Sequence, residues 1–412
     1  MNLLFVVGGY YPRFSATGNC VSKIALSLIK RHNIYVLSEK KDLSDSDSEK
    51  WRGHTIIRIS TPRIRRRLLL VRDNKKYQLL FHKIKYFFSF LNSSGGLDYA
   101  LVNAYLDRIR SICDEKHIDA ILPCCMPIEG VFASLIYSES NPNVSFSPIL
   151  FDLYSDSDIF FRFNFIKKLK HKKTFDIEKK ILNQANYIFY VDNWKNYFLN
   201  HQYLNAIHIE HPLVEEPFPH DTISLKNRNL INIIYQGELN YEIRNPRHSI
   251  SLLKKLLSRD ENHDITLHFF SFGNANKEVE NFSKNNKNCV LYGRVDKEVA
   301  DSYFQDSNIV LIIGNSNPNI MPSKVFEAIS SCKPILYIGC NEMDCVIDVL
   351  SKYPNKFVVT PTTINRNDIE NLFQWITNCE KTTTSFSDIS QLFKEYTPHY
   401  ICDVINNCLE ND

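Results

Sequence analysis

Short apolar runs alternate with longer amphipathic segments along the whole chain. The runs are rich in Val, Ile and Leu, and their length of three to six residues predicts buried parallel strands. They cover residues 3–7, 34–37, 56–59, 120–122, 187–191, 207–210, 231–235, 265–270, 289–292, 309–313 and 335–338. Between them, apolar positions recur at helical spacing, as in residues 21–30, 97–117 and 249–257. This alternation predicts an α/β protein with parallel sheets.

One segment divides the pattern into two halves. Residues 211–219 contain three prolines within nine positions, which is typical of a linker. The chain has 412 residues, enough for two domains with separate cores. We therefore expect a first domain over residues 1–211 and a second over residues 212–387, followed by a helix over residues 388–410.

The composition narrows the class of protein. The apolar share is 44% and the charged share 23%, as in soluble globular proteins, and no apolar run is long enough for a membrane-spanning helix. The N-terminus lacks the basic start and the cleavage site of a signal peptide, so we interpret it as a first strand. The 11 cysteines form no C-x-x-C pair and lie mostly in apolar contexts, so we expect reduced thiols in a cytoplasmic protein. The 13 histidines show no pairing with cysteine at ligand spacing, which gives a metal site little support.

Charge is distributed unevenly along the chain. Residues 1–215 carry 30 Lys and Arg against 21 Asp and Glu, whereas the remainder carries 19 against 25. Two segments, 63–91 and 161–173, combine basic residues with aromatic ones. This mixture predicts contact with an anionic membrane surface, although a solvated loop beside a core helix would look the same. No nucleic-acid-binding motif accompanies these charges, so we expect no nucleic-acid partner.

The most informative stretch covers residues 308–339. An apolar strand is followed by a polar loop and by a helix that begins at Pro322, where the missing N–H costs nothing. The sequence P-S-K-V-F-E-A followed by C-K-P-I-L resembles the signature motif of nucleotide-sugar glycosyltransferases with the two-domain GT-B fold, close to family 4. The resemblance implies that Glu327 holds the ribose, that Lys324 faces the phosphates, and that donors around Ser323 contribute. Many family members have a second Glu where this chain has Asn319, next to the donor sugar.

Further residues follow from the same resemblance. Gly237 and Arg244 match a pattern that places an arginine against the donor diphosphate, with Arg247 as an alternative. Gly293 matches a loop beside the nucleotide base. In the first domain, Gly9 and Gly18 match a loop that approaches the donor phosphates or the acceptor, although plain turn glycines remain an alternative.

One carboxylate is the candidate base for the hydroxyl group of the acceptor. Asp152 follows the apolar residues 147–151, and a carboxylate at the end of a strand is well placed to deprotonate a hydroxyl. The resemblance therefore implies two Rossmann-like domains facing a cleft, with the C-terminal helix packed back on the first domain. It implies transfer of a sugar from a UDP- or GDP-linked donor, with retention and without a metal ion or other cofactor.

The expected acceptor is a glycan, carried on a lipid, in the synthesis of a bacterial capsule, exopolysaccharide or O-antigen. The expected location is the cytoplasm, at the inner face of the cell membrane. Two alternatives stay open: a sugar-nucleotide epimerase of the same fold, and a non-catalytic protein that binds a glycan or another transferase. The identity of the donor sugar, its base, the acceptor, the linkage and the oligomeric state do not follow from the sequence.

Overall fold

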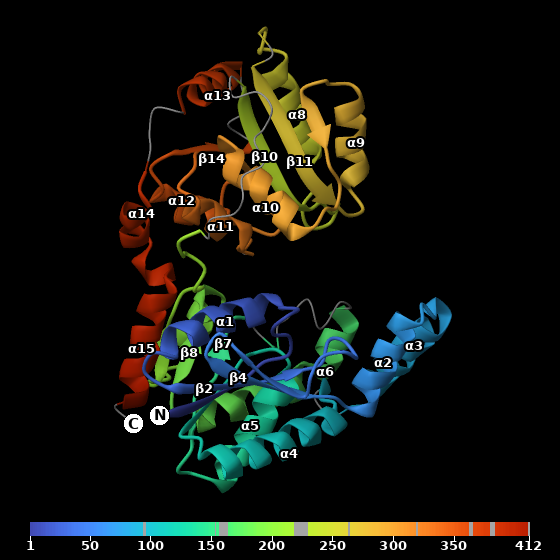
Figure 1. The fold of residues 1–412 in the computed structure, drawn as a ribbon, viewed down its shortest axis with the longest axis vertical. Coiled ribbons are helices and arrows are strands. Elements are labelled where there is room, and N and C mark those ends of the chain that lie inside the picture. The colour runs from blue at the N-terminus through green and yellow to red at the C-terminus, as the bar shows by residue number, and fades with distance from the viewer. Residues whose placement is uncertain are drawn as a thin grey trace. The chain divides into compact units, whose positions relative to one another are not determined.

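The computed structural model divides the chain into two compact units, shown in Figure 1. Unit 1 consists of Met1–Pro212 and Glu395–Asp412, and unit 2 consists of Leu213–Lys394. The structure describes residues 1–93, 96–152, 154–155, 164–217, 230–262, 264–318, 320–361, 366–379 and 384–410.

Unit 1 is built on a six-stranded sheet in the order β3-β4-β2-β1-β5-β6. Its strands are β1 (Asn2–Val6), β2 (Asn33–Glu39), β3 (Ser48–Trp51), β4 (His54–Ile59), β5 (Ala120–Pro123) and β6 (Ser145–Phe146). All pairings are parallel except β3 with β4. A second sheet joins β7 (Ile149–Leu150), β8 (Ile188–Tyr190) and β9 (Ala206–His208) in parallel.

Helices connect and cover these strands. They are α1 (Ala16–Leu28), α2 (Pro62–Arg72), α3 (Lys76–Asn92), α4 (Tyr99–Lys116), α5 (Ile128–Ser140), α6 (Asn164–Gln184), the short turn η2 (Asp192–Trp194) and α7 (Lys195–Asn200). Within this unit α4 packs along α5, and α1 packs on the C-terminal helix α15 (Pro398–Glu410). His32, in the turn after α1, and Asn406 of α15 are joined by a hydrogen bond of 2.6 Å.

Unit 2 repeats the scheme with six parallel strands in the order β12-β11-β10-β13-β14-β15. They are β10 (Ile231–Glu238), β11 (Ile265–Phe272), β12 (Cys289–Leu291), β13 (Ile309–Ile313), β14 (Ile335–Ile338) and β15 (Lys356–Val359). The helices are α8 (Arg247–Leu257), α9 (Asn276–Lys284), α10 (Lys297–Asp306), α11 (Lys324–Ser330), α12 (Cys345–Ser351), α13 (Arg366–Asn378) and α14 (Phe386–Leu392), followed by η5 (Lys394–Tyr396).

The strands form where the sequence predicts because they are buried on both faces. All five residues of β13 and all four of β14 are buried, as expected for central parallel strands covered by helices. The apolar faces of α8, α9 and α13 join the same core of unit 2. Among the described residues, none of the helices combines the length and the apolar content needed to cross a membrane.

Two regions differ from the sequence-based expectation. The acidic loop after β2 contributes β3 to the sheet, and its Asp42 and Asp45 form ion pairs with Arg13 in the loop after β1. The final segment is divided into α14, η5 and α15, because Pro398 takes the first position of a new helix.

Candidate functional site

The crevice of unit 2 follows from its strand order. β10 and β13 are neighbouring parallel strands, and the order of the strands reverses between them. Open α/β sheets bind ligands outside the carboxyl ends of the strands at such a switch point. We therefore expect a binding site at the loops after β10 and β13.

An arginine and an asparagine meet at this switch point. Arg244 follows β10, and its Nε and Nη2 atoms donate to Oδ1 of Asn315, which follows β13, at 3.2 and 2.9 Å. Asn315 is only 4% exposed, and its Nδ2 atom donates to the carbonyl of Ile320 at 3.0 Å. The asparagine thus orients the guanidinium and ties it to the loop before α11.

The backbone beneath the guanidinium is shaped for close packing. Gly237, the penultimate residue of β10, has a φ of +154°, and a Cβ atom there would lie 3.3 Å from the hydroxyl of Tyr235 and 3.5 Å from Nη1 of Arg244. The Tyr235 hydroxyl bonds to the same arginine, although burial dominates and raises the pKa of the phenol to about 12. Glycine at position 237 therefore leaves room for the side chains of Tyr235 and Arg244.

The loop leads to α11, which carries the other predicted donor-site residues. Lys324 and Glu327 form an ion pair at 2.5 Å, and both side chains are partly exposed. Burial opposes charge on Lys297 of α10, but its hydrogen bond to Asp301 and the charges of Asp301 and Glu327 together raise its pKa. Glu327 thus lies near two cations, Lys297 and Lys324. Its ion pair with Lys324 is partly exposed, so a bound ligand could replace it.

Ser323 is the residue immediately before α11. It forms no side-chain capping bond, and its carbonyl accepts from the amide of Phe326 at 3.1 Å. Asn319 lies outside the residues that the structure describes. Lys333, after the same helix, is a structural residue, because its Nζ atom donates to the carbonyls of Gln305 and Ser307 at 2.9 and 2.6 Å.

The structure separates Arg247 from Arg244. The Nε atom of Arg247 donates to Glu278 of α9 at 2.8 Å, and its guanidinium lies over the ring of Tyr241. This exposed pair belongs to the surface between α8 and α9. Arg244 is therefore the better candidate for the diphosphate, as the pattern in the sequence ranked them.

An aromatic cluster near the end of β12 is absent from the sequence-based prediction. Phe270 and Tyr292 stack with their rings 4.3 Å apart and nearly parallel, and the ring of Tyr303 lies 5.0 Å from both. The following residue, Gly293, has a φ of +72° and no atom within 4 Å of a would-be Cβ, so its loop is open. Such rings offer a stacking surface for a planar base. Their sequence spacing of 22 and 11 residues gave no signal.

The loop after β1 has a structural need for glycine. A Cβ atom on Gly18 would lie 1.7 Å from the carbonyl oxygen of Gly9, so the start of α1 fits against this loop only with glycine. Ser15 caps α1 by accepting from the amide of Gly18 at 3.0 Å and donates to the Gly9 carbonyl at 3.1 Å. These contacts favour the turn interpretation for Gly18. Gly9 lies in the loop after β1, where its carbonyl accepts from Ser15.

Asp152 follows β7, the strand whose residue Ile149 is bridged to Cys124 after β5. Burial raises the pKa of its carboxyl. Burial raises the pKa of the Cys20 thiol to about 12; Lys23 opposes this shift and Asp152 adds to it. Burial also raises the pKa of the Cys125 thiol to about 12, and the charge of Asp152 adds to this shift. Both neighbouring thiols are therefore neutral. The carboxyl therefore lies in a poorly solvated place, which favours proton transfer.

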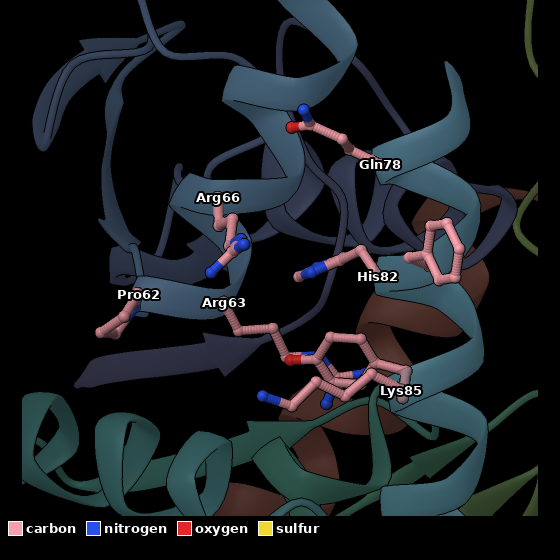
Figure 2. Close-up of a pocket in the computed structure, with 8 residues that line it drawn as sticks. Pro62, Arg63, Arg66, Gln78, His82 and Lys85 are labelled. Carbon is pink, nitrogen blue, oxygen red and sulfur yellow. The ribbon is translucent and has the colours of Figure 1, made fainter. Parts of the chain in front are cut away.

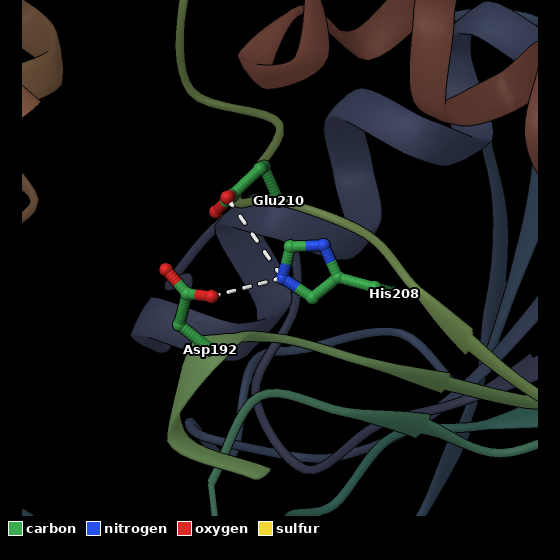
Figure 3. Close-up of side chains that lie close together, drawn as sticks. All are labelled: Asp192, His208 and Glu210. Atoms are coloured by element: carbon green, nitrogen blue, oxygen red, sulfur yellow. Dashed lines mark hydrogen bonds and ion pairs between the residues drawn. The ribbon is translucent and has the colours of Figure 1, made fainter. Parts of the chain in front are cut away.

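Figure 3 shows a second group of titratable side chains in unit 1, at the ends of β8 and β9. Nε2 of His208 lies 3.0 Å from Asp192 and 3.8 Å from Glu210. The ligand atoms of the three residues lie within 4.8 Å of one another and could hold a divalent cation. The sequence gave no sign of this group, because its spacing of 16 and 2 residues matches no cysteine–histidine pattern.

No family model and no curated protein matches the chain. Solved structures do match over its full length. The UDP-forming α,α-trehalose-phosphate synthase from Burkholderia xenovorans, in complex with glucose-6-phosphate, has a TM-score of 0.61 at 8% identity, with 100% of both chains covered.

Sucrose-phosphate synthase from Thermosynechococcus elongatus has a TM-score of 0.60 at 11% identity, covering 100% of this chain and 98% of the other. The chain has the GT-B fold. The lipopolysaccharide outer core galactosyltransferase WaaB also matches, with a TM-score of 0.53 at 12% identity and coverage of 100% and 99%. At such identities the likeness concerns the fold alone.

Proposed function

We propose that the protein is a glycosyltransferase that moves a sugar from a nucleoside diphosphate donor to a hydroxyl group. The observation that carries this proposal is the Arg244–Asn315 pair at the switch point of unit 2, in a chain with the GT-B fold. A guanidinium fork held by a neutral amide keeps its full charge and can bind two phosphate oxygens. A protein that only binds other proteins has no use for such a partly buried, oriented guanidinium.

The proposed sugar transfer gives each candidate residue a distinct role. As the bond between the anomeric carbon and the diphosphate breaks, Arg244 and Lys324 stabilise the negative charge on the leaving oxygen. The acceptor oxygen bonds to the same carbon, and its proton passes to Asp152 or to the leaving phosphate. Glu327 binds the ribose hydroxyls, and the rings at Tyr292 stack on the base. Cationic side chains thereby do the work that a metal ion does in other transferases, and the anomeric configuration is retained.

The donor and acceptor classes extend the proposal. A synthase that forms UDP is similar in structure, which supports a UDP-linked donor ahead of a GDP-linked one. We assign the acceptor to a glycan on a lipid carrier, in the assembly of a capsule, exopolysaccharide or lipopolysaccharide. The basic and aromatic hairpin of α2 and α3 supports contact with the inner face of the membrane.

Titration with nucleotides tests the proposal. UDP, GDP and CMP are added separately to the full-length protein while its thermal midpoint or heat of binding is measured. A ligand that binds only the folded protein raises the midpoint, so one nucleoside diphosphate should do so saturably. Lys324→Ala and Glu327→Ala should each weaken that binding. Failure of all three nucleotides to bind the wild-type protein would refute the donor site.

One observation favours a second candidate. A proposed UDP-N-acetylglucosamine 2-epimerase from Listeria monocytogenes also matches, with a TM-score of 0.55 at 10% identity and coverage of 99% and 95%. An epimerase interconverts two nucleotide sugars without an acceptor. Incubating each UDP-sugar with the protein alone and separating the products would distinguish the two, because a transferase leaves the donor intact or hydrolyses it.

A further inference from the structure

A cavity of about 460 Å³ lies in unit 1 between α2 and α3. Figure 2 shows basic side chains from both helices and ring-bearing side chains from α3 around it. The cavity is lined by Pro62, Arg63 and Arg66 of α2 and by Gln78, Phe81, His82, Lys85 and Tyr86 of α3. It is distinct from the strand ends that carry the candidate catalytic residues.

The charge around this cavity is positive and largely uncompensated. Residues 62–92 contain nine Lys and Arg but a single acid, Asp73, which already pairs with Arg72 and Lys75. Arg63 is the cavity residue with a carboxylate partner, Asp98, and it also lies over the ring of Tyr86. A cavity with this charge distribution attracts an anion.

His82 adds a hydrogen-bonding group that no other side chain uses. Its Nε2 atom is buried and has no hydrogen-bond partner among the described residues. Burial lowers the pKa of the imidazole, and the charges of Arg66, Arg63, Arg67 and Lys85 lower it further. A neutral imidazole can donate from Nε2, and a bound phosphate oxygen would satisfy the atom while balancing the cations.

One face of α3 is apolar and exposed to solvent. Tyr77, Phe81, Ile84 and Phe88 follow the i, i+4, i+7, i+11 spacing of a helical stripe, with Leu80 and Phe87 beside them. Tyr77 is 84% exposed and Phe81 72% exposed, and the other four are between 38% and 58% exposed. Phe81 also lines the cavity, so the stripe and the cavity adjoin.

We propose that this cavity binds the phosphate group of an anionic lipid while the exposed stripe of α3 enters the interface of the bilayer. Arg66 and Lys85 pair with the phosphate, and the aromatic and aliphatic side chains of the stripe occupy the boundary between headgroups and acyl chains. A symmetric contact between the hairpins of two copies is disfavoured, because two equally basic hairpins repel each other. The inference rests on the proposed membrane contact but not on the transferase activity.

The test compares two adjacent arginines on α2. Arg66 lines the cavity and Arg65 does not, yet both are exposed and carry the same charge. The full-length protein and its Arg65→Gln and Arg66→Gln variants are sedimented with vesicles of phosphatidylcholine, with or without phosphatidylglycerol. Circular dichroism and thermal unfolding, measured in parallel, report that each variant is folded and do not depend on nucleotide binding or on the membrane result.

We expect binding only to vesicles that contain phosphatidylglycerol. Removing either charge should weaken it about fivefold, since each basic residue near an anionic surface contributes about that factor. Arg66→Gln should lose a further factor on the order of ten, from its charge-assisted hydrogen bond to the phosphate. Ile84→Ser should weaken binding to the same vesicles, because it replaces an apolar side chain of the stripe by a polar one.

Three outcomes would overturn the inference. Equal losses for Arg65→Gln and Arg66→Gln would mean diffuse attraction without a headgroup site. Absence of binding to both kinds of vesicle would remove the lipid as the occupant. Thermal stabilisation by inorganic phosphate that depends on Arg66, without any vesicle binding, would assign the cavity to a soluble phosphate compound.

Discussion

The two units share a parallel scaffold but place opposite chemistry at their strand ends. In the small sheet of unit 1, each strand is followed by a carboxylate: Asp152 after β7, Asp192 after β8 and Glu210 after β9. Burial raises the pKa of Asp152, and it raises that of Glu210 to about 7. In unit 2 the corresponding loops carry Arg244, held by Asn315, and the ion pair of α11.

The difference teaches how one architecture can serve two partners. Poorly solvated carboxyls accept protons and orient hydroxyls, whereas arginines held by neutral amides attract phosphate. The scaffold fixes where such groups gather, because parallel strands bring their carboxyl ends to one edge. The residues placed there decide the chemistry, so the contrast can be tested one side chain at a time.

The largest effect is expected at Arg244. Arg244→Lys keeps the charge but loses the planar fork, and it should lower kcat/KM for donor turnover by about a hundredfold to a thousandfold. Release of the nucleoside diphosphate is the measurement. Arg247→Lys is the matched control and should stay within a few-fold of the wild type, because Arg247 is engaged by Glu278. Equal losses in both variants would contradict the assignment of the diphosphate to Arg244.

The next effect concerns the carboxyl of unit 1. Asp152→Asn should lower kcat about a hundredfold, as for loss of a general base, while the affinity for the nucleotide stays unchanged. Folding stability should not fall, since burial penalises the charged form. The acidic limb of the wild-type pH–rate profile should lie above the usual carboxyl range. A loss of nucleotide binding instead of kcat would assign Asp152 to the donor side. The exposed Asp107 on α4 provides Asp107→Asn as a control.

A third effect appears in stability against pH. Burial chiefly raises the pKa of Glu210 from 4.5 to about 7, aided by Asp192 and Glu395 and opposed by His208 and Tyr396. The folded protein therefore holds this proton more tightly than the unfolded chain does. Stability should fall as the pH rises from about 4.5 to about 7, by on the order of 3 kcal/mol, and then level off. His208 acts in the same direction, because its hydrogen bond to Asp192 raises its pKa.

Glu210→Gln should remove most of this dependence. The variant should melt several degrees above the wild type at pH 8 and close to it at pH 5. Thermal unfolding followed by circular dichroism at both pH values is the measurement. Glu115→Gln, on the exposed face of α4, should match the wild type at both. A variant that is less stable at pH 8 would show that the Glu210 carboxylate contributes through its partners instead.

Much of the fold could be predicted from the sequence because burial on both faces leaves a strong trace. Runs such as residues 309–313 and 335–338 coincide with β13 and β14. The β3 strand could not be predicted, because its residues Ser48–Trp51 are mostly polar and pair only at an edge. The division of the C-terminal segment was also missed, although Pro398 was a signal for a new helix start.

The candidate site divides in the same way. Residues within one contiguous motif, such as Lys324 and Glu327, could be named together from the sequence, and the structure brings them into contact. Asn315 was missed, because its partner Arg244 lies 71 residues away and only the strand order brings them together. The group of Asp192, His208 and Glu210 was missed for the same reason.

The smallest effect is expected from the ion pair between Lys324 and Glu327. Both side chains are more than a third exposed, so their coupling should contribute about 0–1 kcal/mol to stability and should weaken with salt. A double-mutant cycle with Lys324→Ala and Glu327→Ala, followed by chemical unfolding, measures this coupling. Lys333→Ala sets the scale for a structural lysine and should cost more, because it removes two partly buried hydrogen bonds to backbone carbonyls. A coupling well above 1 kcal/mol would mean that the pair stabilises unit 2, and it would then be a poor candidate for side chains that separate to bind a nucleotide.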